Sequence, residues 1–123
     1  MQVISTPDAP SAIGPYSQAV SINGFLFISG QVALVPKTGE VIGSTINEQA
    51  EQCCKNIQAI LKANDMTFAN VVKTTCFLDD MTDFSAFNNV YENYFISKPA
   101  RSCVAVKELP KKLLCEIEVI AVR

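Results

Sequence analysis

The last strand-like segment, Leu114 to Val122, constrains the fold most strongly, because both of its faces are largely apolar. Alternate side chains of an extended strand point to opposite sides of a sheet. One face would carry Cys115, Ile117, Val119 and Ala121, and the other Leu114, Glu116, Glu118, Ile120 and Val122. A strand with this pattern belongs in a sheet that is covered on both sides.

The first half of the chain predicts a β-hairpin followed by a helix. Ser17–Ile22 and Phe25–Ser29 read as strands, and Asn23-Gly24 between them is the signal of a two-residue type I′ turn. After a turn-rich link, Thr45-Ile46-Asn47-Glu48 has the pattern of a capping box and predicts the start of a helix. Apolar residues then recur at helical spacing until Asn64-Asp65 stops the helix.

The second half predicts two more strands around a second helix. Val71–Leu78 is apolar and β-branched, and its helix-length connection predicts that it runs parallel to an earlier strand. Asp80 and Asp83 bracket the start of the second helix, and Ser102–Val106 reads as a buried strand. The second helix carries an aromatic stripe that would pack on the sheet: Phe84, Phe87, Tyr91 and Tyr94 or Phe95.

These elements predict an α+β fold with a mixed β-sheet and two helices on one face. A chain of 123 residues forms one domain, residues 1–123, without repeats or linkers. No segment remains to cover the second face of the sheet. Because 49% of the residues are hydrophobic and only 18% are charged, we expect a closed oligomer that packs sheet against sheet.

Composition excludes several classes of function. The chain has no histidine, which removes His-dependent triads, nucleases and zinc sites. Its five cysteines include no Cys-x-x-Cys pair, so we expect reduced thiols and no metal site. A net charge of −2 gives nucleic-acid binding little support. No run reaches the length of a membrane span and Met1–Ser5 lacks the pattern of a secretory signal, so we expect a cytoplasmic protein with no membrane partner.

Arg101 is the first candidate for a functional residue, because a permanent charge stands where an apolar strand begins. Such a charge requires an anionic partner. The partner is either internal, at Glu116 or Glu118 on the last strand, or external, as the carboxylate or phosphate of a ligand. The residues alone leave both alternatives open.

Four other positions accompany Arg101 as candidates. Glu116 and Glu118 lie on an otherwise apolar strand face, where a carboxylate is either paired or functional. Their strand spacing of about 7 Å suits a glycosidase pair, but the absence of tryptophan argues against a sugar platform. Tyr16 stands in a tight turn before the hairpin, and Gly30 ends a strand where a backbone can approach a ligand or a neighbouring subunit closely.

Taken together, four segments closely resemble the RidA (YjgF/YER057c/UK114) family. They are Ala12-Ile13-Gly14-Pro15-Tyr16-Ser17-Gln18-Ala19, Ser29-Gly30-Gln31, Pro99-Ala100-Arg101-Ser102-Cys103-Val104, and Leu109-Pro110 before Glu116-Ile117-Glu118-Val119-Ile120-Ala121. The resemblance implies a chorismate-mutase-like (YjgF-type) protomer in a homotrimer, with helices outside, a central barrel of sheets and three clefts between subunits. It also implies a 2-iminobutanoate/2-iminopropanoate deaminase that needs no cofactor and acts on reactive products of pyridoxal-phosphate-dependent dehydratases.

The resemblance assigns roles to six residues. Arg101 would grip the substrate carboxylate, Glu116 would position or activate water, and Tyr16 would line the cleft. Cys103 would contribute its backbone, while Asn88 and Gly30 would lie near the same cleft.

Two alternatives remain at this stage: a non-catalytic carboxylate-binding or chaperone-like trimer, and an endoribonuclease or translation inhibitor. The segment Phe95–Pro99 looks shorter than the corresponding loop of many relatives, which would alter the mouth of the cleft and the substrate preference.

Overall fold

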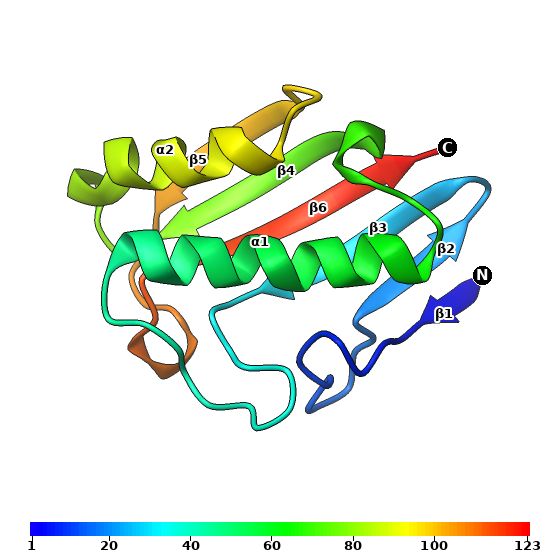
Figure 1. The fold of residues 1–123 in the computed structure, drawn as a ribbon, viewed down its shortest axis with the longest axis horizontal. Coiled ribbons are helices and arrows are strands. Elements are labelled where there is room, and N and C mark those ends of the chain that lie inside the picture. The colour runs from blue at the N-terminus through cyan, green and yellow to red at the C-terminus, as the bar shows by residue number, and fades with distance from the viewer.

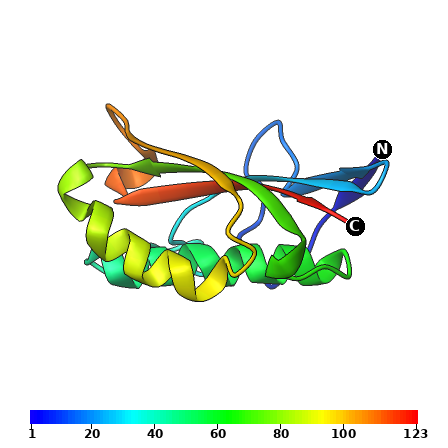
Figure 2. The same cartoon turned by 90° about the horizontal axis from the view of Figure 1, so that it is seen from above.

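The computed structural model describes all residues, 1–123, as one six-stranded mixed sheet with two α-helices on one face (Figures 1 and 2). The strands lie in the order β1-β2-β3-β6-β4-β5. Their bounds are β1 (Gln2–Ile4), β2 (Ala19–Ile22), β3 (Phe25–Gln31), β4 (Val71–Leu78), β5 (Ala100–Ala105) and β6 (Cys115–Val122). The helices are α1 (Ile46–Ala63) and α2 (Phe84–Tyr94), with short 3₁₀ turns η1 (Phe68–Asn70), η2 (Met81–Asp83) and η3 (Pro110–Lys112). The predicted single α+β domain is confirmed.

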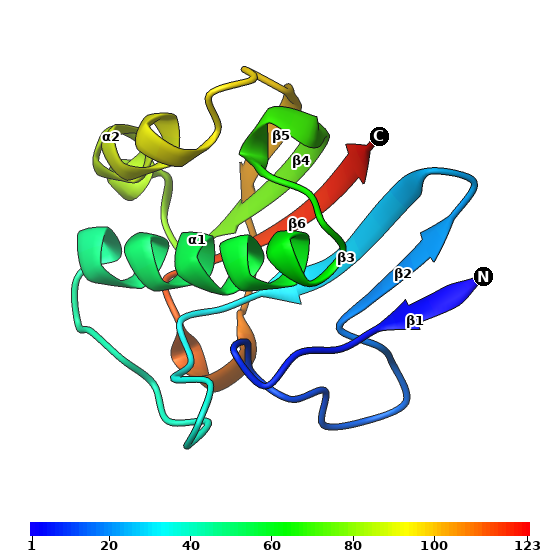
Figure 3. The ribbon, with the colours of Figure 1, turned by 45° about the vertical axis from the view of Figure 1, so that its right-hand side comes forward.

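The direction of β4 agrees with the sequence prediction, but the strands that lie beside it were not predicted. β6 is antiparallel to both β3 and β4, so β4 runs in the same direction as β3, the earlier strand. However, β6 separates the two, and the strand that pairs with β4 in parallel is the later β5. β1, which pairs with β2 at the far edge, was not predicted. Figure 3 shows the β1–β3 region at one side of the sheet and β5 with α2 at the other.

The two faces of the sheet differ in the way that the alternation of β6 predicts. Cys115, Ile117, Val119 and Ala121 are buried against the helices, together with Leu26 of β3 and Ile57 and Ile60 of α1. The opposite face carries no helix (Figure 2). Several large apolar side chains on this face are exposed. Phe25 and Phe27 of β3 are 42% and 40% exposed, and Val104 of β5 is 47% exposed. Neither helix combines the length and apolarity that a membrane span requires.

The strand predicted over Ser102–Val106 is present, but the prediction that it is buried is wrong for a single protomer. β5 spans Ala100–Ala105 at the edge of the sheet, where it pairs only with β4. Its side chains are half-buried or exposed, because no element covers its outer edge. The apolar composition of this segment therefore reflects a surface that is open in the isolated chain.

Buried amide side chains of α1 fasten the loops at one end of the sheet. Asn56 is 1% exposed and donates to the carbonyl oxygens of Val32 and Leu34, each at 3.1 Å. Gln49 donates to the Gly43 carbonyl at 3.2 Å and accepts from the Leu114 amide at 2.7 Å. These bonds hold the segments that follow β3 and precede β6 against α1 and leave their buried polar groups satisfied.

We expect Asn56→Ala to destabilise the fold by about 1–3 kcal/mol, because it strands two buried carbonyl groups. Gln58→Ala, an exposed amide on the same helix, is the matched control and should change the free energy of unfolding by less than about 0.5 kcal/mol. Urea unfolding of both variants measures the difference. Equal stabilities for the two would contradict the role assigned to Asn56.

Candidate functional site

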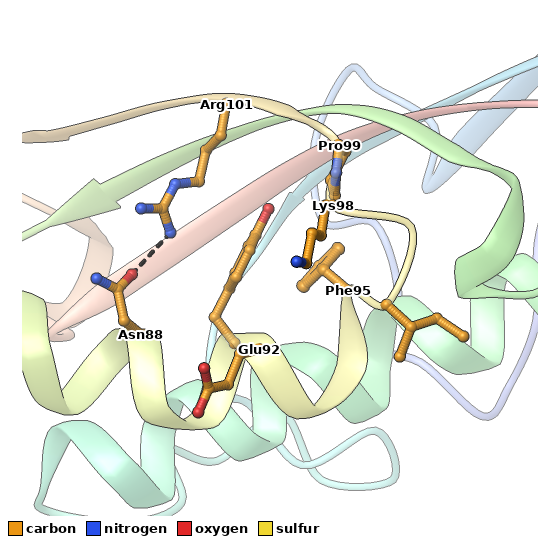
Figure 4. A pocket seen from close by; sticks show the side chains of 8 residues that line it. Asn88, Glu92, Phe95, Lys98, Pro99 and Arg101 are labelled. Carbon is orange, nitrogen blue, oxygen red and sulfur yellow. Dashed lines mark hydrogen bonds between the residues drawn. The ribbon is translucent and has the colours of Figure 1, made fainter.

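Arg101 lies on β5 with its side chain directed toward α2 (Figure 4). It stands opposite Thr74 of β4, which is fully buried on the helix side of the sheet. Nη1 of Arg101 donates to Oδ1 of Asn88 on α2 at 2.8 Å. The guanidinium carbon lies 4.7 Å from the ring centroid of Tyr91 and 5.5 Å from that of Phe84. Cation–π contacts and one amide therefore hold the charge without neutralising it.

Tyr91 is a neutral, fixed support for this charge. Its hydroxyl group shares a hydrogen bond of 2.7 Å with Oγ1 of Thr74, and its ring stacks on Phe95 at 4.1 Å between centroids. Burial raises the pKa of Tyr91 to about 12. The ring is thus uncharged at neutral pH and offers its face to the guanidinium.

The Arg101 side chain opens onto a surface pocket of about 600 Å³. The pocket is lined by Asn88, Tyr91, Glu92, Phe95, Ile96, Lys98, Pro99 and Arg101. Cys103, two residues further along β5, faces the same side of the sheet as Arg101 and stands opposite Cys76. Burial raises the pKa of the Cys103 thiol above its ordinary value, so the side chain is a protonated thiol at neutral pH rather than a nucleophile.

A second group of predicted residues gathers elsewhere, around Glu116. A Cβ added to Gly30 would lie 2.7 Å from Cδ and 2.9 Å from Oε2 of Glu116, so the carboxyl group rests directly over the glycine backbone. The β3–β6 register shifts between Ile28 and Gln31, which places Gly30 at a bulge. A pocket of about 340 Å³ joins Glu116 and Gly30 to Tyr16.

Tyr16 projects from a loop that a buried glutamine fastens to the sheet. Gln18 accepts from the Thr6 amide at 2.7 Å and donates to the carbonyl oxygens of Ala9 and Pro10 at 3.3 and 2.8 Å. The loop is therefore held at its base, whereas Tyr16 itself is 55% exposed. This arrangement presents the phenol at the edge of the Glu116 pocket.

The pKa of Glu116 is raised above its ordinary value. Partial burial is the main cause, and repulsion from the Glu118 carboxylate is the second. Glu116 stands opposite Phe77 and Glu118 opposite Thr75, both on the face that lacks helices. A carboxylate with a raised pKa is a stronger base than a solvated one, which suits proton abstraction from water.

Within one protomer, the two groups of residues do not meet. Arg101 points to the helix side of the sheet and Glu116 to the open side, two strands away and displaced by three residues along β4. These offsets place their Cα atoms about 14 Å apart. The internal Arg–Glu pair that the sequence left open is therefore not formed in the chain. The structure brings Arg101, Asn88 and Cys103 together, and Tyr16, Gly30 and Glu116 together.

Sequence reasoning missed the role of Phe84 and Tyr91, which were assigned to the core. Together with Asn88 they occupy positions i, i+4 and i+7 of one helix face, where side chains are neighbours. The polar side chain of Asn88 between the aromatic residues of this face is the signal that could have indicated the contact with Arg101. No group of three or more His, Cys, Asp or Glu side chains is arranged to hold a metal ion.

Comparison with known proteins gives consistent results across the chain. The family model described as Endoribonuclease L-PSP matches residues 6–123. The 2-iminobutanoate/2-iminopropanoate deaminase of Mus musculus is 50% identical over 123 residues, covering 99% of this chain and 91% of that protein. A RutC family protein of Pyrococcus horikoshii is 50% identical over 121 residues, covering 98% of this chain and 96% of that protein.

A solved structure extends the similarity to the fold. The crystal structure of Escherichia coli TdcF with bound serine superposes with a TM-score of 0.95 at 40% identity, covering 100% of this chain and 99% of that chain. Sequence and fold thus agree over nearly the full length of the chain. The chain belongs to the Endoribonuclease L-PSP family, which is the RidA (YjgF/YER057c/UK114) family that its motifs resemble.

Proposed function

We propose that this protein hydrolyses reactive 2-imino acids, such as 2-iminobutanoate and 2-iminopropanoate, to 2-keto acids and ammonia. The observation that carries the proposal is the guanidinium of Arg101, which Asn88, Tyr91 and Phe84 hold in place without an anionic partner. A fixed guanidinium with free N–H donors is suited to a carboxylate. The mouse relative that bears the deaminase name is 50% identical to this chain.

The active site lies between two subunits of a homotrimer. Arg101, Asn88 and Cys103 come from one subunit, and Tyr16, Gly30 and Glu116 from its neighbour. Support comes from the separation of the two groups within one chain and from the open apolar face that carries Phe25 and Phe27. Assembly of three sheets around a common axis would cover this face and bring the two groups to one cleft.

The chemistry needs only positioning and one base. Arg101 binds the carboxylate of the imino acid, and the Glu116 carboxylate takes a proton from water as the water oxygen attacks the imine carbon. Glu116 passes this proton to the imine nitrogen, which gives an amino alcohol. As the C–N bond of the amino alcohol breaks, Glu116 carries the remaining hydroxyl proton to the nitrogen, which leaves as ammonia. Water is thereby split between the keto oxygen and the ammonia that leaves. Orientation and a preorganised charge supply most of the acceleration.

The other site residues support this reaction without entering it. Asn88 orients the guanidinium, Cys103 contributes its backbone, and Tyr16 lines the cleft beside Glu116. Gly30 provides the space in which the Glu116 carboxyl group lies. The reactive imines would be supplied by pyridoxal-phosphate-dependent dehydratases in the cytoplasm, where this protein would act.

Two other roles compete with this proposal: a carboxylate-binding or chaperone-like trimer without turnover, and an endoribonuclease. The name of the family model includes the second role. With no histidine and a net charge of −2, the chain offers RNA neither the commonest general base nor an overall excess of positive charge. Turnover of the imine, compared with RNA cleavage in the same preparations, separates the three roles.

Arg101→Lys keeps the positive charge but loses the planar fork, so we expect turnover to fall at least tenfold while the melting temperature changes little. Arg101→Ala should abolish binding of 2-oxobutanoate as well. The assay couples the protein to a threonine dehydratase and follows the transient imine by semicarbazone trapping. Wild-type turnover in Arg101→Ala would remove Arg101 from the mechanism, and RNA cleavage lost in that variant would favour the nuclease.

Glu118→Gln should move the acidic limb of the activity profile to lower pH. Glu118 repels the ionised form of Glu116, so its neutralisation lowers the pKa of Glu116 and preserves the base at lower pH. Asp65→Asn, a charge removed beyond the end of α1, is the control and should leave the profile in place. An acidic limb that does not move in Glu118→Gln would show that Glu116 is not the titrating base.

The open face of the sheet should control assembly. We expect wild-type protein to scatter light as three chains, and Phe27→Glu to yield smaller species, because a buried unpaired charge costs several kcal/mol. Met81→Glu changes another exposed apolar residue, 44% exposed, in the 3₁₀ turn η2 before α2, and should remain trimeric. A monomeric wild-type protein at micromolar concentration would exclude a site shared between subunits.

A further inference from the structure

Lys98 gives the pocket beside Arg101 a second positive charge. Both residues line this pocket, and Glu92 is the one acidic residue in its wall. Figure 4 shows the Arg101 guanidinium directed toward Asn88 and the Lys98 side chain extending from the loop toward α2, with Asn88 and Glu92 below them. The pocket is thus positively charged in a chain whose net charge is −2. The 2-imino acids of the proposed reaction carry only one carboxylate, for which Arg101 suffices.

The backbone at Lys98 adopts a conformation that its sequence disfavours. Its φ of 50° lies in the left-handed region, and the residue directly precedes Pro99, which normally restricts its neighbour to extended conformations. Such a conformation persists only where the surroundings impose it, and it is often found at functional sites. Here the Lys98 amide donates to the Phe95 carbonyl at 3.1 Å.

The surroundings of Lys98 are well anchored. Oγ of Ser97 donates to the Val71 carbonyl at 2.7 Å, which ties the loop to the start of β4. Phe95 is buried, stacks on Tyr91 at 4.1 Å and meets Phe68 edge-on at 5.0 Å. The loop backbone is therefore fixed relative to Tyr91, which also supports Arg101. The long flexible stem of Lys98 then allows its ammonium to reach over the pocket from a fixed origin.

We propose that the pocket selects 2-imino and 2-keto acids that carry a second carboxylate. Arg101 binds the carboxylate next to the reacting carbon, as in the proposed function on which this inference rests, and Lys98 binds the distal one. Glu92 opposes the second contact, so the preference requires the Lys98 ammonium to lie closer to the distal carboxylate than the Glu92 carboxylate does. The apolar side chains of Phe95 and Ile96 contact the carbon chain between the two carboxylates.

The test compares 2-oxoglutarate with 2-oxopentanoate, which have the same carbon chain but end in a carboxylate and a methyl group. Calorimetric titration of the assembled protein at low ionic strength should show about two- to fivefold tighter binding of 2-oxoglutarate, the range of one exposed ion pair. Lys98→Met keeps the apolar stem and should remove this preference. Glu92→Gln should increase it about twofold, and added salt should weaken it.

Lys55→Met is the matched control, because it removes the same charge from an exposed position on α1, outside this pocket. It should retain the preference of the wild-type protein. Equal affinity of the wild-type protein for the two acids, or a preference that survives Lys98→Met, would overturn the inference and leave the proposed function intact. Failure of both acids to bind would overturn the carboxylate site itself. Binding of both without turnover of any imine would overturn only the catalytic role.

Discussion

The insertion of β6 between β3 and β4 is the constraint on which the rest of the structure depends. The last strand of the chain hydrogen-bonds to both, and it thereby joins the N-terminal hairpin to the β4-α2-β5 unit (Figure 1). Its helix-side residues complete the core, and its other face places Glu116 directly over Gly30 of β3. β4 lies between β6 and β5, so the position of Arg101 relative to Glu116 is fixed by the β6–β4 and β4–β5 registers.

Local features of the fold could be predicted because short-range interactions determine them. Asn23 and Gly24 both have positive φ, 51° and 82°, as a type I′ turn requires, and Thr45 caps α1 by accepting from the Glu48 amide at 3.2 Å. The order of strands could not be predicted in the same way. Alternation along β6 identifies which of its residues share a face, but not which strands lie beside β6. Likewise, the apolar residues of β5 do not reveal that β5 is an edge strand.

The candidate site was predictable to the same degree: residue patterns single out its members, but not how they are arranged in space. The sequence singles out Arg101 as a charge in need of a partner, and the resemblance adds Asn88, whose amide accepts from it. The contact with Tyr91 depends on how α2 lies against β5, and periodicity alone reads that ring as core. The separation of Arg101 from Glu116 depends on register across two strand pairs, which residue patterns along a single strand do not encode.

The partners of the two central charges explain why they are kept apart. Arg101 is oriented by an amide and aromatic faces, all of them neutral, so its charge stays available for an incoming carboxylate. A carboxylate in place of Asn88 would compete with that ligand. Conversely, an arginine beside Glu116 would lower the pKa that burial and Glu118 raise, and so weaken the base. An Arg101–Glu116 ion pair within one chain would neutralise the charge of Arg101 and lower the basicity of Glu116. Their placement on opposite faces of the sheet keeps the two groups apart within one chain, as the proposed site between subunits requires.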